Sequence, residues 1–159
     1  QTQGAIAYHI PKEGDIVERK EFALKDIGLD TVQNKVSFFQ GDACNLKPIY
    51  TGYDLIFCSN LIDRLHSPKL FLEEIGKRLN EGGILVILSP YTWLSEYTKK
   101  ENWLGGYETK GKEVYTIDTL HATLTDFELL SAQDVPFVIK ETARKYQHTI
   151  SQMSVWKKV

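Results

Sequence analysis

Two short and nearly continuous apolar runs, residues 53–58 and 84–88, dominate the middle of the chain. Runs of this kind are typical of strands that are covered on both faces, as in a parallel sheet. Between them, apolar residues recur at helical spacing from 71 to 79. Ser67 and Pro68 suit the start of that helix, and the glycines within residues 80–83 suit its end. The pattern predicts a β–α–β unit with a right-handed crossover.

The flanking regions carry weaker patterns. Residues 5–10 and the extended run from residue 16 enclose turn residues, which predicts a hairpin. A helical turn is expected over 23–29, and Asp118 is expected to cap a helix that carries Leu120 and Leu124. Further strands are expected over 36–41, 127–132, 136–139 and 149–156, with a polar segment over 140–148. We expect one partial domain over 1–159, with a hairpin and irregular lead-in over 1–34 and an α/β core over 35–159.

Composition narrows the class of protein without identifying it. The 159 residues are 42% hydrophobic and 25% charged, which excludes collagen-like, low-complexity and wholly disordered chains. The formal net charge of −2 gives no basic excess that would favour nucleic acid or an anionic membrane. No apolar run approaches the roughly 20 residues of a membrane helix, and no signal peptide is visible, so a cytoplasmic location is expected.

Cys44 and Cys58 are the two cysteines, and each lies beside or within an apolar stretch. They are interpreted as small core thiols in a reducing compartment, with a redox or nucleophilic role as the alternative. The spacing of Cys and His matches no metal motif, so no metal site is expected.

Ligands of open α/β sheets bind beyond the carboxyl ends of the strands. That rule selects three segments, residues 41–46, 59–64 and 89–93. Asp42 suits a hydrogen bond to a nucleobase amine or ribose hydroxyl, or alternatively caps the following turn. Asn60 either orients a ligand or occupies a turn.

The same segments hold a possible ion pair and two aromatic side chains. Asp63 and Arg64 are adjacent, and their pairing would be worth little if it is exposed. Tyr91 and Trp93 either wall a pocket or pack in the core. Nucleophile–base pairs, HExxH, a Walker loop and GxGxxG are all missing from the sequence, so hydrolase, kinase and metalloenzyme functions have no support. Chemistry that depends on positioning remains open.

Three segments together resemble the second half of a class I methyltransferase that uses S-adenosylmethionine: residues 41–43, 53–56 and 81–85. The resemblance implies a Rossmann-like α/β sheet. It implies that Asp42 and Ala43, with Cys44 beside them, contact the adenine of the cofactor. It also implies that Asn60 and Leu61 lie beneath the methionine part.

A narrower resemblance covers about residues 13–157. It rests on residues 41–48, 60–65, 89–94, 103–106, 134–139 and 141–149. These segments are similar to the C-terminal methyltransferase domain of ovothiol synthase, of the 5-histidylcysteine sulfoxide synthase family. The resemblance implies N-methylation of the imidazole of 5-thiohistidine, with S-adenosylhomocysteine as the other product. It also implies an iron-dependent sulfoxide synthase domain as the N-terminal partner.

A zwitterionic aromatic acceptor needs a cation, an acid and aromatic walls. Candidate acceptor contacts are therefore Asp63, Trp93, Trp103, Glu141, Arg144 and Tyr146, with His148 and Tyr91 as candidate catalytic residues. Arg144 is the first choice as carboxylate clamp, and His148 is the candidate for proton removal. The alternative for residues 141–148 is a solvated loop between two strands.

The sequence departs from the class I pattern at its start. The usual strand order is 3-2-1-4-5-7-6, and neither strand 1 with its Gly-rich turn nor strand 2 is visible before Ala5. Without strands 1 and 2, the sheet would have a gap between strands 3 and 4. We expect one of three outcomes: the missing strands have been cut off, another chain fills the gap, or the gap closes and residues 36–41 pair with 53–58. Two other functions stay open: a catalytically silent methyltransferase-like binding module or inactive fragment, and a methyltransferase with a different acceptor.

Overall fold

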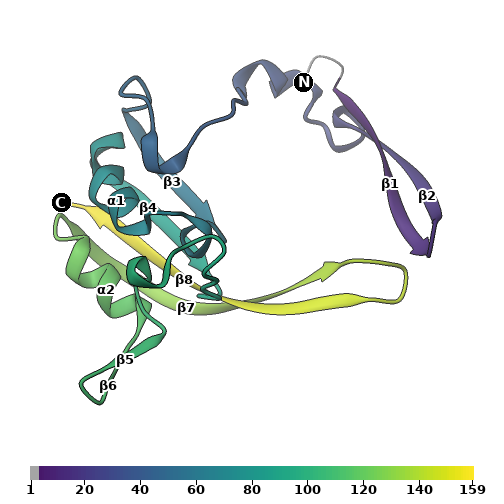
Figure 1. The fold of residues 1–159 in the computed structure, drawn as a ribbon. Coiled ribbons are helices and arrows are strands. Elements are labelled where there is room, and N and C mark those ends of the chain that lie inside the picture. The colour runs from purple at the N-terminus through teal and green to yellow at the C-terminus, as the bar shows by residue number, and fades with distance from the viewer. Residues whose placement is uncertain (1–3) are drawn as a thin grey trace. The chain divides into compact units, whose positions relative to one another are not determined.

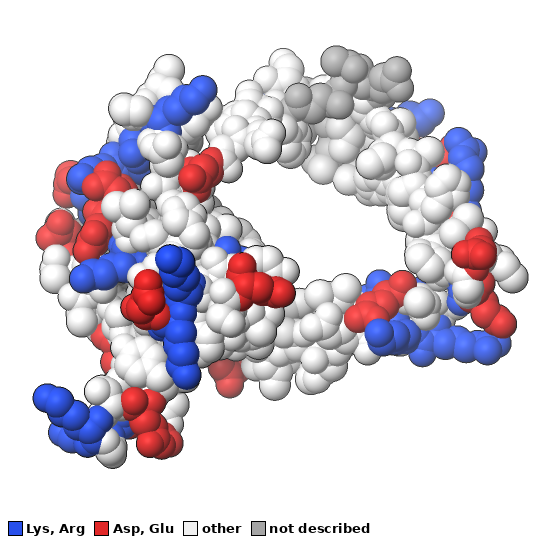
Figure 2. Space-filling model, in the orientation of Figure 1, with Lys and Arg blue, Asp and Glu red and all other residues white. Residues whose placement is uncertain are grey.

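The computed structural model describes residues 4–159, which divide into two compact units. The first unit comprises residues up to 40 together with 137–149, and the second comprises 41–136 and 150–159. On the face drawn in Figure 2, Lys and Arg side chains are interspersed with Asp and Glu, as the nearly balanced composition leads one to expect.

The first unit contains the hairpin expected from the sequence. Strands β1 (Ala5–Glu13) and β2 (Ile16–Ala23) pair antiparallel around a turn in which Gly14 has a φ of 52°. The 3₁₀ helices η1 (Leu24–Ile27) and η2 (Asp30–Lys35) follow, and η1 matches the expected helical turn.

The prediction of a strand over residues 36–41 is wrong. No part of that segment is a strand, and Phe38 is 73% exposed. Its apolar pattern suits a strand, but a strand also needs a hydrogen-bonded neighbour. The expected neighbour was β3 (Tyr53–Ser59), which pairs only with β4 (Leu79–Ser89) among the described strands. The sheet has therefore not closed up in the way that was considered.

The second unit is built on a four-stranded sheet with the order β3-β4-β8-β7 (Figure 1). Strand β4 is parallel to β3 and antiparallel to β8 (Tyr146–Lys158). Helix α1 (Pro68–Ile75) and the 3₁₀ turn η5 (Gly76–Arg78) cross from β3 to β4, which confirms the predicted β–α–β unit. The helix ends earlier than expected because Leu79 already pairs with Tyr53.

Several other boundaries differ from the expectation. Strand β7 (Phe127–Lys140) is one strand where two were expected, and β8 begins at Tyr146, inside the expected polar segment. Pro136 is tolerated in β7 because that strand lies at the edge of the sheet. Helix α2 (Thr116–Thr123) has Tyr115 at its N-cap, so Asp118 lies in the first turn rather than at the cap.

The remaining elements are short. The 3₁₀ turns are η3 (Ala43–Asn45), η4 (Ile62–Arg64) and η6 (Lys100–Asn102), and a small hairpin joins β5 (Tyr107–Thr109) to β6 (Lys112–Val114). No helix within residues 4–159 is both long and apolar enough to cross a membrane.

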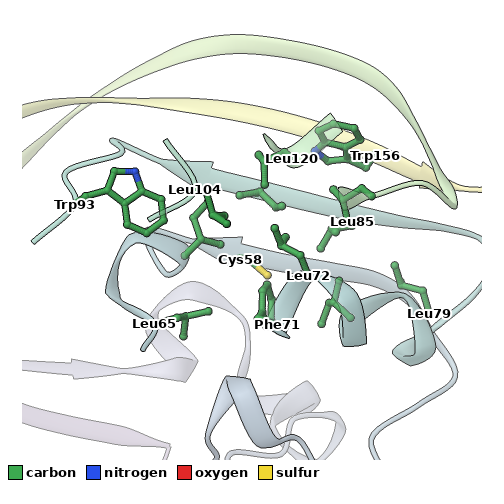
Figure 3. Close-up of a cluster of buried hydrophobic side chains, with 14 residues drawn as sticks. Cys58, Leu65, Phe71, Leu72, Leu79, Leu85, Trp93, Leu104, Leu120 and Trp156 are labelled. Carbon is green, nitrogen blue, oxygen red and sulfur yellow. The ribbon is translucent and has the colours of Figure 1, made fainter. Parts of the chain in front are cut away.

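One face of the sheet carries the core, and α1 and α2 both contribute to it (Figure 3). Alternate strand residues point toward these helices, as the period of two in a strand requires. The central members, all nearly inaccessible to solvent, are Cys58, Phe71, Leu72, Leu85, Ile87, Leu120 and Trp156.

The opposite face of β3 is largely exposed. Leu55 is 57% exposed and Phe57 is 60% exposed, while Cys58 on the other face is 4% exposed. In the register of the sheet, Leu55 and Phe57 pair with Ile84 and Val86, which are half-buried. The expectation that these strands are covered on both faces is therefore wrong for β3.

Replacing Gly105 with alanine is expected to destabilise the second unit. A Cβ there would lie 2.3 Å from the Thr116 nitrogen and 2.6 Å from the Tyr115 carbonyl carbon, both of them backbone atoms. Forcing them apart should cost about 2–3 kcal/mol of unfolding free energy, which urea denaturation would measure. Gly41→Ala is the matched control, since nothing lies within 4 Å of a Cβ at that position. Equal stability of the two variants would contradict the close packing.

Candidate functional site

The carboxyl ends of β3 and β4 carry two residues with strained backbones. Asn60 follows β3 with a φ of 51°, and Tyr91 lies two residues after β4 with a φ of 53°. Positive φ is uncommon for residues other than glycine, and such strain is often found at functional sites. Both residues were predicted from their places after the strands, and the structure brings those strand ends side by side.

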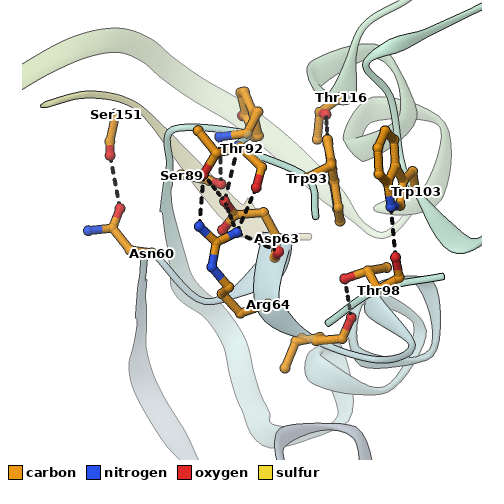
Figure 4. A network of polar contacts seen from close by, with 12 residues as sticks. Asn60, Asp63, Arg64, Ser89, Thr92, Trp93, Thr98, Trp103, Thr116 and Ser151 are labelled. Atoms are coloured by element: carbon orange, nitrogen blue, oxygen red, sulfur yellow. Dashed lines mark hydrogen bonds and ion pairs between the residues drawn. The ribbon is translucent and has the colours of Figure 1, made fainter. Parts of the chain in front are cut away.

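Asn60 is held by the backbone and by a distant strand. Its N–H donates to the Leu88 carbonyl at 2.8 Å. Its Oδ1 accepts a hydrogen bond from the Ser151 hydroxyl at 2.9 Å (Figure 4). These contacts fix Asn60 between β4 and β8 despite its backbone conformation.

Asp63 is a buried carboxylate at the centre of a polar network (Figure 4). Its Oδ2 accepts from the Thr92 N–H at 3.1 Å, from the Thr92 hydroxyl at 3.0 Å and from Arg64 Nη1 at 3.0 Å. Its Oδ1 is buried and has no hydrogen-bond partner among the described residues. A buried acceptor without a partner suits an N–H or O–H donor from a ligand or water.

Arg64 links the η4 turn to the loop that follows β4, residues 90–92. It donates to the Thr92 carbonyl at 2.7 Å and to the Asp63 carbonyl at 2.9 Å, and its guanidinium lies 5.3 Å from the centre of the Tyr97 ring. The Asp63–Arg64 pair is thus partly buried, rather than the weak exposed pair considered from the sequence.

Tyr91 is half-buried, and its hydroxyl donates to Gln152 Oε1 at 3.0 Å. Burial, together with the nearby Asp63 carboxylate, raises the pKa of Tyr91 to about 12. The phenol is therefore protonated at neutral pH and acts there as a hydrogen-bond donor.

Trp93 and Trp103 stack with their ring centres 6.3 Å apart. Trp93 is 7% exposed and donates from Nε1 to the Thr116 hydroxyl at 3.1 Å. Trp103 is half-buried and donates to the Thr98 carbonyl at 2.8 Å. Trp93 thus packs in the core, which was one of its two interpretations, and Trp103 is the more accessible of the pair.

The predicted cofactor residues Asp42, Ala43 and Cys44 lie at η3. Asp42 is its N-cap, and Asp42 Oδ1 accepts from the Cys44 N–H at 2.9 Å. The capping role considered from the sequence is thus present, and it engages one of the two carboxylate oxygens. Leu61, the remaining cofactor candidate, is half-buried against the core.

The two cysteines should differ in reactivity. Cys58 is 4% exposed, and burial raises its pKa to about 12, while Cys44 is half-buried with a pKa that burial also raises. Because the thiolate is the reactive form, both should react slowly with Ellman's reagent near neutral pH, and reaction of Cys44 should speed up first as the pH rises. Cys44→Ala should remove this phase; a fast reaction that survives in this variant would contradict the assignment.

The predicted acceptor contacts Glu141, Arg144 and Tyr146 and the candidate catalytic residue His148 belong to the first unit. Glu141 and Arg144 lie in the turn between β7 and β8, and Tyr146 and His148 lie in the first residues of β8. Glu141 pairs with Lys145 at 2.5 Å, and the Arg144 N–H donates to the Thr142 hydroxyl at 3.2 Å. All except Glu141 are exposed. Asp63, Tyr91, Trp93 and Trp103 belong to the second unit.

Sequence reasoning missed Ser151 and Gln152, and it did not single out Thr92, although Thr92 lies in the predicted segment 89–93. Ser151 and Gln152 reach the site because β8 runs antiparallel beside β4, with Gln152 paired to Ser89. That register is a long-range property which no local pattern of the sequence reveals.

Comparisons with known proteins concern the fold and the class of domain. Residues 15–87 match the family model of a methyltransferase domain. No curated protein matches the chain. Among solved structures, 23 chains match.

One of these structures concerns the conversion of a disulfide bond into a thioacetal group during echinomycin biosynthesis. It is 12% identical, has a TM-score of 0.53, and the match covers 85% of this chain and 61% of that chain. The likeness shows the fold, and this chain spans about 61% of that structure's length.

The order β3-β4-β8-β7, with β8 antiparallel to β4, corresponds to the 4-5-7-6 part of the class I order. Together with the match of residues 15–87 to a methyltransferase domain, this order shows that the mixed α/β sheet has the Rossmann-like fold of class I methyltransferases.

Proposed function

We propose that this chain is an S-adenosylmethionine-dependent methyltransferase domain that methylates the imidazole nitrogen of 5-thiohistidine, as in ovothiol biosynthesis. The observation that carries the proposal is the pair of strained residues, Asn60 and Tyr91, at the adjoining ends of β3 and β4. The match of residues 15–87 to a methyltransferase domain supports the reaction class.

Polar groups at η3 and after β3 fit the chemical groups of the cofactor. Asp42 at η3 and Asn60 after β3 present carboxylate and amide groups that pair with hydroxyl or amine groups, and the buried Oδ1 of Asp63 has no donor among the described residues. When bound, S-adenosylmethionine supplies a methyl group that its positively charged sulfur activates. Asp42, Ala43, Cys44, Asn60 and Leu61 are the proposed contacts.

The protein's part of the reaction is positioning. Methyl transfer is an in-line displacement, so the enzyme must align the acceptor nitrogen and exclude water. A strong protein base is not required, because an imidazole nitrogen has its own lone pair. Tyr91 remains protonated and donates a hydrogen bond, and His148 is the proposed acceptor of the proton that the ring loses.

Arg144 is the proposed clamp for the acceptor carboxylate, and Glu141 the partner of its ammonium. Tyr146 and Trp103 are the proposed aromatic contacts, since both retain exposure, and Asp63 and Trp93 are proposed contacts from the second unit's network. The N-terminal sulfoxide synthase domain is the proposed partner in the full-length enzyme.

The direct test combines binding with turnover. Isothermal titration with S-adenosylmethionine or S-adenosylhomocysteine should show binding to the complete enzyme, and Asn60→Ala should weaken it. A methyl-transfer assay should favour 5-thiohistidine over histidine. Binding without turnover of either would favour a silent binding module, and turnover of histidine alone would favour a different acceptor.

Arg144→Ala in the complete enzyme is expected to raise KM for 5-thiohistidine by about 10- to 100-fold, the value of a hydrogen bond between charged groups. KM for the cofactor should stay unchanged. Arg19→Ala is the matched control, because Arg19 is another exposed arginine of the first unit, paired with Glu21 on β2. Equal effects of Arg144→Ala on both KM values would rule out the clamp.

A further inference from the structure

Three side chains with different metal-binding atoms converge beside η3. Ligand atoms of Asp42, Cys44 and His66 all lie within 4.8 Å of one another. Asp42 and His66 are exposed, and Cys44 is half-buried, so a small ion can reach them from solvent. They come from two separate loops, one at η3 and one between η4 and α1.

Each of the three is already held in place by contacts of the protein. Asp42 Oδ1 accepts from the Cys44 N–H, which fixes the two residues relative to each other. Cys44 Sγ donates to the Ser67 carbonyl at 3.4 Å, and this links the η3 loop to the residue after His66. The His66 carbonyl accepts from Asn102 Nδ2 at 3.1 Å.

The donor set selects the metal. A thiolate, an imidazole and a carboxylate are the ligands of zinc, whereas calcium and magnesium take oxygen ligands. Bond lengths of about 2.0–2.3 Å place the ligands of a tetrahedral zinc roughly 3.3–3.8 Å apart. The ligand atoms lie within 4.8 Å of one another, so they are at most about 1.0–1.5 Å farther apart than in such a site.

We infer that Asp42, Cys44 and His66 form a site for a divalent ion of the zinc class. Three protein ligands leave the fourth tetrahedral position for water or another ligand. The ion would fasten the η3 turn to the loop that enters α1.

Binding to this site is coupled to protons. A thiol must lose its proton to bind zinc, so one proton is released from Cys44 and affinity rises with pH.

The site shares Asp42 and Cys44 with the proposed cofactor contacts, but His66 is not one of those contacts. His66→Ala therefore tests the metal site without removing a proposed cofactor contact, and Asn60→Ala does the reverse. Failure of one proposal is in this way distinguishable from failure of the other.

The experiment is a titration of the whole chain with Co²⁺, a spectroscopic substitute for zinc, and with Zn²⁺ by calorimetry. One equivalent should bind with micromolar or tighter affinity, and cobalt should give a thiolate-to-metal charge-transfer band. Cys44→Ala should abolish the band, and His66→Ala should weaken binding at least about tenfold.

His9→Ala is the matched control, because His9 is an exposed histidine of β1 that does not belong to the cluster, and this variant should bind metal as the unchanged chain does. Circular dichroism of the variants verifies folding, and Asp42→Asn supplies a second variant if Cys44→Ala does not fold. Absence of binding to the unchanged chain, binding without the charge-transfer band, or equal loss in His9→Ala and His66→Ala would overturn the proposal.

Discussion

Asp63→Ala is expected to lower the free energy of unfolding by about 3 kcal/mol, because it removes a buried carboxylate that accepts three hydrogen bonds. The Thr92 N–H would lose its acceptor, and the Arg64 guanidinium would lose its counter-charge. The expected cost lies at the lower end of the range for broken buried ion pairs because the Arg64 side chain is 35% exposed and water partly solvates its charge. Urea denaturation followed by circular dichroism measures the change.

Asp63→Asn separates charge from hydrogen bonding. Its amide oxygen still accepts from Thr92, so its cost should be clearly smaller than that of alanine. Asp54→Ala is the matched control, since Asp54 is an exposed aspartate that makes one side-chain hydrogen bond, with Asn80. If Asp63→Ala costs no more than Asp54→Ala, Asp63 does not hold η4 and the loop after β4 together. The rate of methyl transfer should also fall in Asp63→Ala, because Tyr91 and Thr92 lie on the loop after β4, which loses its contact with Asp63.

The β–α–β unit was predictable because its signals are local. The apolar runs of β3 and β4 and the Ser67–Pro68 helix start each lie within a few residues of the structure that they specify. Strand ends are also local, so the rule that ligands bind beyond them could select Asn60, Asp63 and Tyr91 as candidates. The hairpin of β1 and β2 was recognisable from its turn residues for the same reason.

The segment 36–41 shows where local reasoning fails. Its apolar residues resemble those of β3, and both segments have strongly exposed members, Phe38 and Phe57. Only β3 has a hydrogen-bonded neighbour, and pairing is a property of two segments rather than one. The same argument explains why we expected β3 to be buried on both faces, whereas only one face is buried. An apolar run indicates that a segment forms a strand, but it does not indicate which other elements cover the two faces of that strand.

The candidate site shows the same limit at the level of side chains. Ser151 meets Asn60, and Gln152 meets Tyr91, only through the register of β8 against β4. His66 meets Cys44 only because the loop before α1 folds back on η3. A search for metal motifs by spacing could not find this group, because its ligands come from two loops that the fold, and not the sequence spacing, brings together.

Trp156→Ala is expected to lower the free energy of unfolding by about 4 kcal/mol, since it removes a large side chain that is 1% exposed. Its ring lies 4.9 Å from that of His121, nearly perpendicular, and its Nε1 donates to the Ser154 hydroxyl at 2.9 Å. The neighbouring Val155 points to the other face, so Val155→Ala should cost only about 1 kcal/mol. Chemical denaturation of both variants tests whether one face of the sheet provides most of the stability. Similar losses of unfolding free energy would mean that the second face is covered as well, which would contradict the exposure of Leu55 and Phe57.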